Sequence, residues 1–210
     1  MLFKWQEVGN VPSEPGVYAW YYELTITRYD INRVIEQVSY YKDAGDFSKA
    51  KSAISQFLHK FIFQYFTEEP YSTLISGLLK PKYEGELEHT PETSDSLISR
   101  IVEDPERLYT IKEILSGSVP TFASPMYIGM SSDLQRRIST HKKLITKFRA
   151  KESVNFGSKR DQSFALRVAE RKLIPTRLCV AVKEISDNAP GYVDAENILN
   201  RINFPILGRN

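Results

Sequence analysis

The chain has 210 residues, of which 41% are hydrophobic and 26% charged, so it suits one ordinary domain or two small ones and is not disordered throughout. A single cysteine excludes a disulfide framework or a Cys-rich zinc site and is consistent with a reducing compartment. We find no apolar run long enough to span a bilayer and no signal-peptide pattern. We therefore expect a cytoplasmic protein without a membrane partner.

The charge is distributed unevenly along the chain. The formal net charge is only +2, but residues 125–210 contain 16 Lys and Arg against 8 Asp and Glu, a net of +8, and residues 1–124 have a net of −6. Between residues 136 and 177 there are 13 basic and 3 acidic residues. A concentrated basic segment is typical of a protein that binds a polyanion. A solvated basic face without a ligand is the alternative.

In the first half of the chain, the aromatic and β-branched run GVYAWYY at residues 16–22 predicts a strand. Residues 48–66 carry apolar side chains at the spacing of an amphipathic helix, and residues 31–41 form a weaker helix candidate. A third helix is predicted over 105–115, with Gly117 just past its end. Residues 67–93 are rich in Pro, Gly, Glu and Thr, which indicates a loop or a short hairpin.

The second half alternates strands and helices after a predicted loop at residues 117–121. Ser132, with Gln135 three residues later, forms a potential capping box at the start of a helix whose apolar face is Leu134, Ile138 and Ile145. The other expected elements are a strand over 124–130, a helix over 163–174, a strand over 178–183 and a helix over 192–203.

The strands at 16–22 and 124–130 are alike in composition, yet about a hundred residues separate them. Because sequential strands usually pair, we expect them to form a hairpin with the intervening segment inserted at its tip. The predicted fold class is α/β (α+β), with a small antiparallel sheet of about three strands flanked by helices. Residues 1–22 and 122–210 would form one domain, and residues 23–121 a mainly helical insertion.

Two tripeptides in the strands stand at defined distances from polar residues. Gly16-Val17-Tyr18 lies in the first strand, and Tyr127-Ile128-Gly129 in the second. Arg137 follows Tyr127 by ten residues and His141 follows Arg137 by four, so both project from one face of the predicted helix. The last helix contains Glu196, and the final residue is Asn210.

This set of motifs resembles the GIY-YIG nucleases, whose fold occurs in homing endonucleases, some restriction enzymes and an excision-repair endonuclease. The resemblance covers residues 12–22 and 124–210, a little under half of the chain. It departs from the family in the long insertion between the two name motifs. It departs also in the distance from Pro205 to Asn210, which leaves Asn203 and Asn200 as alternatives for the family's asparagine.

The resemblance implies a metal-dependent DNA endonuclease that hydrolyses phosphodiester bonds with one Mg²⁺ or Mn²⁺ ion. A single carboxylate suits an ion of this kind, which keeps most of its water ligands, and a guanidinium offers a planar fork to a phosphate. We expect Tyr18 to act as the base, with Tyr127 and His141 as hydrogen-bonding partners. The implied catalytic residues are Tyr18, Tyr127, Arg137, His141, Glu196 and Asn210, with Glu196 as the metal ligand. The expected DNA contacts are Arg136, Lys142, Lys143, Lys159 and Arg160.

Two other possibilities stay open at this point. A catalytically inactive module of the same fold would bind nucleic acid or protein, and an unrelated α/β domain would share only the pattern of residues. Within the nuclease interpretation, a restriction or defence role is favoured over repair, because the chain has no recognisable helicase or damage-recognition module. The acidic insertion, residues 23–121, would form a homodimer interface or contact a protein partner.

Overall fold

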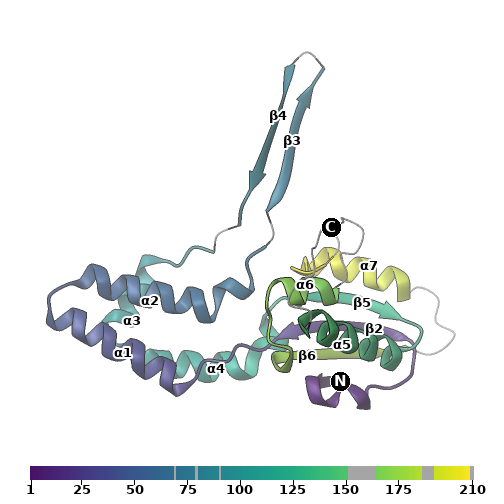
Figure 1. Ribbon diagram of the computed structural model, residues 1–210, viewed down its shortest axis with the longest axis horizontal. Helices are drawn as coiled ribbons and strands as arrows, with labels where there is room; N and C mark the ends of the chain where they lie inside the picture. Colours follow the sequence, from purple (N-terminus) through teal and green to yellow (C-terminus); the bar gives the residue numbers. More distant parts are fainter. Residues whose placement is uncertain (69, 79, 90, 151–163, 186–191, 209–210) are drawn as a thin grey trace. The chain divides into compact units, whose positions relative to one another are not determined.

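The computed structural model describes residues 1–68, 70–78, 80–89, 91–150, 164–185 and 192–208 (Figure 1). The protein has an α+β fold that combines helices with antiparallel sheets. It divides into two compact units, unit 1 (Met1–Thr25 with Ile114–Asn210) and unit 2 (Ile26–Glu113). The insertion was expected over residues 23–121. Unit 2 is shorter than this by three residues at its start and by eight at its end. Among the described residues, no helix combines the length and apolarity that a membrane crossing requires.

Unit 1 is built on a four-stranded sheet in which every neighbouring pair is antiparallel. The strands lie in the order β1 (Leu2–Lys4), β6 (Leu178–Glu184), β2 (Gly16–Tyr22) and β5 (Tyr127–Ser131). Strands β2 and β5 pair as expected, despite the inserted unit between them. The expected count of about three strands omitted β1, because three residues are too few to show an alternating pattern.

The two faces of this sheet are covered by different helices. Tyr18, Trp20 and Tyr22 of β2 are buried on one face. On that face Tyr18 contacts His141 of α5 (Leu134–Ala150), and Trp20 stacks on Phe164 of α6 (Phe164–Glu170). The alternate residues of β2 face the other side, where Leu199 and Asn203 of α7 (Tyr192–Asn203) close a cavity of about 230 Å³. The period-2 alternation of side chains thus separates two environments.

The start of α5 differs in detail from the predicted capping box. The N-cap is Asp133, whose Oδ1 accepts the backbone N–H of Arg136 at 2.9 Å, and Ser132 is not the cap. Ser131 Oγ accepts the N–H of Asp133 and thereby moves the helix start by one residue. The side chain of Gln135 is used elsewhere, since it accepts from Ser13 and donates to the carbonyl of Gly9. The predicted apolar face is buried, as expected.

Helix α6 ends at Glu170, short of the predicted end at residue 174. Lys172 adopts a left-handed conformation with φ of 54°, and Leu173 donates its N–H back to the carbonyl of Val168. This is the hydrogen-bond pattern of a Schellman C-cap. The left-handed position is normally a glycine, so a lysine there does not indicate the end of a helix in the sequence. The strand and helix predicted at 178–183 and 192–203 correspond closely to β6 and α7.

Unit 2 has a helical core with four helices among its described residues, the last of which continues into unit 1. The helices are α1 (Arg28–Asp43), α2 (Phe47–Phe61), α3 (Asp95–Glu103) and α4 (Arg107–Phe122). Side-chain caps from Thr27, Asp46 and Ser94 begin the first three. The expected loop at 117–121 is wrong, because α4 runs on through Gly117, a residue that costs a helix only about 1 kcal/mol. Helix α3 was not expected.

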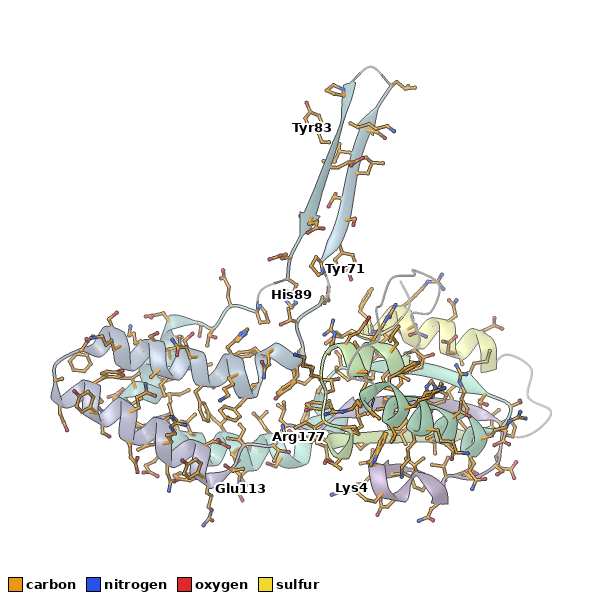
Figure 2. All side chains as sticks on the ribbon, viewed as in Figure 1. Lys4, Tyr71, Tyr83, His89, Glu113 and Arg177 are labelled. Carbon is orange, nitrogen blue, oxygen red and sulfur yellow. The ribbon has the colours of Figure 1, made fainter. Side chains whose placement is uncertain are left out.

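The segment expected to be a loop or short hairpin is a long hairpin of β3 (Tyr71–Gly77) and β4 (Lys80–Leu87). Figure 1 shows the two strands side by side as a ribbon. In Figure 2 Tyr71 lies at the end of this ribbon that joins the rest of the chain, whereas Tyr83 lies toward the tip. Among the described residues, neither strand contributes to the buried core of unit 2.

Candidate active site

The two tyrosines of the strand motifs lie on the same face of adjacent strands. Tyr127 is directly opposite Trp20 in the β2–β5 ladder, and Tyr18 is opposite Gly129. The rings of Tyr18 and Tyr127 are 6.1 Å apart. A Cβ atom at Gly129 would lie 2.6 Å from the Tyr18 hydroxyl, a distance that real Cβ contacts do not reach. The phenol of Tyr18 can therefore occupy this position only because Gly129 has no side chain.

Helix α5 adds two nitrogen-bearing side chains to this face. The hydroxyl of Tyr18 lies 2.9 Å from Nε2 of His141, in a buried hydrogen bond. Nε of Arg137 donates to the same hydroxyl at 3.3 Å. Since the Tyr18 oxygen accepts from Arg137, its own proton is available to donate to His141. The structure thus brings together four of the predicted site residues: Tyr18, Tyr127, Arg137 and His141.

Phe164 supports these groups from α6. Its ring stacks on Tyr127 with centroids 4.9 Å apart and meets His141 edge-on at 5.3 Å. The Phe164 side chain is buried, so it shields one side of the histidine from water. Phe164 was not among the predicted site residues, because a single aromatic residue at the start of a helix looks like any core residue.

Burial sets the protonation of the central pair. Desolvation raises the pKa of Tyr18 well above its ordinary value, the neighbouring Tyr127 raises it further, and the hydrogen bond from Arg137 opposes this rise. Desolvation also lowers the pKa of His141 to about 3, and the positive charge of Arg137 contributes to the lowering. At neutral pH the pair is therefore an uncharged phenol and an uncharged imidazole. The imidazole can accept a proton through Nε2.

Glu196 lies apart from this group on the helix that packs against the opposite face of the sheet. Leu199 and Asn203, three and seven residues farther along α7, line the cavity against that face, which places Glu196 on the same side of the helix. Its Oε1 accepts a hydrogen bond from Asn200 Nδ2 at 2.8 Å. The interactions that the structure shows for the Glu196 side chain are with Asn200, and none joins it to Tyr18.

A metal ion would find one well-placed carboxylate on α7. Glu196 is half-buried, and Asn200 Nδ2 donates a hydrogen bond to its Oε1. Within the described part of the chain, no three His, Cys, Asp or Glu side chains gather into a ligand cluster. The donor set fits a hard cation such as Mg²⁺ that retains most of its waters, with Glu196 as its protein ligand.

The residues expected to contact DNA have different surroundings. Arg136 and Lys143 are exposed on α5. The ammonium of Lys142 instead donates to the carbonyl of Trp5 at 2.7 Å and lies 5.3 Å from the centre of its ring. Asn203 uses its amide to donate to the carbonyl of Leu199. Three predicted residues lie outside the described part of the chain: Lys159, Arg160 and Asn210.

The chain was compared with protein families, curated proteins and solved structures. No family, no curated protein and no solved structure matches it.

Proposed function

We propose that the protein is a metal-dependent DNA endonuclease that hydrolyses phosphodiester bonds in the manner of the GIY-YIG nucleases. The observation that carries the proposal is the Tyr18 hydroxyl, bonded on one side to Nε2 of His141 and on the other to Arg137. A buried acceptor, a phenol and a guanidinium in one chain of hydrogen bonds provide a proton path beside an anion-binding group.

In the proposed reaction, Tyr18 passes the proton of an attacking water molecule to His141. The Tyr18 oxygen takes a proton from the water as its own proton moves to Nε2, so the tyrosine is neutral before and after the step. The low pKa of His141 disfavours the imidazolium in the free protein, and the negative charge of a bound phosphate would raise that pKa. Arg137 is the exposed member of the group and holds the phosphate next to this oxygen. Glu196 would hold the divalent ion, which when bound supplies positive charge for the phosphoryl and leaving oxygens of a substrate that reaches from the Arg137 side of the sheet to α7.

The charge distribution supports DNA as the substrate. Helix α5 carries Arg137 at the site and exposes Arg136 and Lys143 near it, within the segment that holds 13 basic and 3 acidic residues. Phosphate contacts of this kind supply most of the sequence-independent affinity for DNA. The choice of a restriction or defence role over repair is part of the proposal.

The decisive experiment is cleavage of supercoiled plasmid DNA by the purified protein in the presence of Mg²⁺ or Mn²⁺. Wild type should nick or linearise the plasmid, whereas Arg137→Ala and Glu196→Ala should not. Arg33→Ala is the matched control, because it removes an equal charge from an exposed position of α1 in unit 2. Equal cleavage by all four proteins would contradict the site assignment and would point to a contaminating nuclease.

One observation favours a second candidate, a catalytically inactive module that binds nucleic acid. Glu196 belongs to a helix on the face of the sheet opposite Tyr18, and its shown side-chain partner is Asn200. If this candidate is correct, the protein binds duplex DNA in a gel-shift assay, Arg136→Ala weakens that binding, and neither metal gives cleavage. Cleavage that disappears in Glu196→Ala would exclude it.

A further inference from the structure

The β3–β4 hairpin is an exposed ribbon with two very different faces. The cross-strand pairs Tyr71–Leu87 and Ile75–Tyr83 lie on one face, which is therefore apolar. All four of these side chains are exposed, between 46% and 64%. A two-stranded ribbon on its own is marginally stable in water, and a third strand or a packing partner is normally needed. The ribbon thus has the features of a surface that another element completes.

The two edges of the ribbon differ as strongly as its faces. Strand β3, with the sequence YSTLISG, has neither a charged residue nor a proline. Strand β4, with the sequence KPKYEGEL, contains two lysines, two glutamates and a proline in eight residues. Charges and proline on an edge strand are the usual protection against pairing with another chain. The β4 edge is therefore protected, whereas the β3 edge is open.

We infer that β3 pairs with β3 of a second copy of this chain, antiparallel, to form a four-stranded sheet in the order β4-β3-β3-β4. An uncharged strand is compatible with itself, since no like charges meet when two copies pair. A two-fold axis near Leu74 places Thr73 of one copy beside Ile75 of the other, so that the two apolar faces join into one. The hydroxyl of Thr73 is buried and has no hydrogen-bond partner within the described residues. In the dimer it would lie beside β3 of the second copy.

The protected strand also limits the size of the assembly. Pairing through β3 leaves only β4 at both outer edges of the sheet, and its lysines, glutamates and proline oppose further addition. One open edge and one protected edge on each chain therefore give a closed dimer and not a fibre. This inference rests on the hairpin alone and does not depend on nuclease activity.

The first test is the mass of the full-length protein in solution, measured by light scattering or sedimentation over a wide dilution series. Leu74→Lys places a charge on the open edge, next to Glu84 of its own hairpin, so the ribbon keeps a favourable cross-strand pair. We expect this variant to raise the dimer dissociation constant at least about tenfold. Glu84→Lys is the matched control on the protected strand and should remain dimeric.

The second test locates the contact with cysteines introduced one at a time. The native Cys179 is buried and does not compete for cross-linking in the folded protein. Under mild oxidation, Leu74→Cys should give a covalent dimer, as should neighbouring positions of β3 to a smaller extent, whereas Glu84→Cys should not. Wild-type protein that is monomeric at every concentration would overturn the inference. So would larger open assemblies, or cross-linking through β4 equal to that through β3, because each requires another contact or another partner for the ribbon.

Discussion

The hydroxyl of Tyr18 and Nε2 of His141 lie 2.9 Å apart in a buried hydrogen bond, although 123 residues separate them in the chain. The bond joins β2, an inner strand of the sheet, to helix α5. In the sequence, all of unit 2 lies between these two elements. Both groups are uncharged at neutral pH, so in the tautomer that leaves Nε2 unprotonated the phenol donates and the imidazole accepts. In the proposed reaction, this bond is the path by which a proton leaves the attacking water.

Replacing Tyr18 by Phe removes the hydroxyl and keeps the ring. We expect the rate of plasmid nicking to fall by about a hundredfold or more, since a positioned proton-transfer group contributes a factor of this size. The free energy of unfolding should fall by about 1–3 kcal/mol, because His141 loses its buried hydrogen-bond partner. Tyr21→Phe, on the opposite face of the same strand, is the control and should retain activity. A fully active Tyr18→Phe protein would contradict the proton path.

The stability of the fold should depend on pH through His141. Its pKa is 6.5 in an unfolded chain and about 3 in the fold, so between these values the unfolded chain binds a proton that the folded protein does not. The stabilising contribution is therefore present above pH 6.5 and is lost as the pH falls toward 3, by up to about 1.4 kcal/mol per pH unit. The free energy of unfolding, measured by urea denaturation and plotted against pH over this range, should rise more steeply with pH for wild type than for His141→Gln. If the two proteins showed the same dependence on pH, His141 would not have a lowered pKa in the fold.

Gly129 should tolerate no side chain. In Gly129→Ala the new Cβ would collide with the Tyr18 hydroxyl and with the ring of Tyr127, which lies 2.9 Å from the same position. We expect a loss of about 1–3 kcal/mol of stability together with loss of cleavage, because the phenol has to move. Gly9→Ala, at a position with no atom within 4 Å, should be close to wild type in both measurements. Similar stabilities of the two variants would show that Tyr18 does not occupy this position.

Asn200 should influence the metal requirement without being a ligand. Its amide holds Oε1 of Glu196, and the loss of such a contact typically weakens metal binding about 10–100-fold. Asn200→Ala should therefore need more Mg²⁺ for half-maximal cleavage while reaching a similar rate at saturation. Asn197→Ala, whose side chain accepts from Arg201 instead, is the control. An unchanged metal dependence in Asn200→Ala would argue against metal binding at Glu196.

The thiol of Cys179 should react only after the protein unfolds. Burial raises its pKa to about 12, and the nearby Glu23 adds to the effect, so thiolate is scarce at neutral pH. We expect a thiol-specific reagent to label the protein at a negligible rate in buffer and completely in denaturant. Rapid labelling in buffer would mean that the β6 strand is accessible, contrary to the sheet described here.

Sequence alone predicted the pairing of β2 with β5, because the two strands are alike in composition and sequential strands usually pair. It also placed Arg137 and His141 on one helical face, since the four-residue spacing is dictated by helix geometry. Elements whose signals are short or atypical were missed. The three-residue β1 shows no period, Lys172 ends α6 where glycine is usual, and α4 continues through Gly117.

The site was less accessible to prediction wherever a side chain takes part through contacts distant in sequence. Phe164 joins the site because α6 folds over Trp20, and nothing in its local sequence indicates that contact. Lys142 looked like a free surface cation, yet it is held by Trp5, a residue 137 positions away. The position of Glu196 relative to the sheet likewise depends on the packing of Leu199 and Asn203, which periodicity alone does not assign to a face.

The pairing of β2 with β5 has a consequence for how the protein folds. Met126 donates its N–H to the carbonyl of Trp20 at 2.7 Å, so the chain returns to β2 after passing through all of unit 2. Closing a disordered segment of that length delays folding, because its entropy is lost before the long-range contacts form. Once unit 2 has its own helical core, it behaves as a much shorter connection. We therefore expect unit 2 to fold first, and mutations in its core to slow the assembly of the sheet that carries Tyr18.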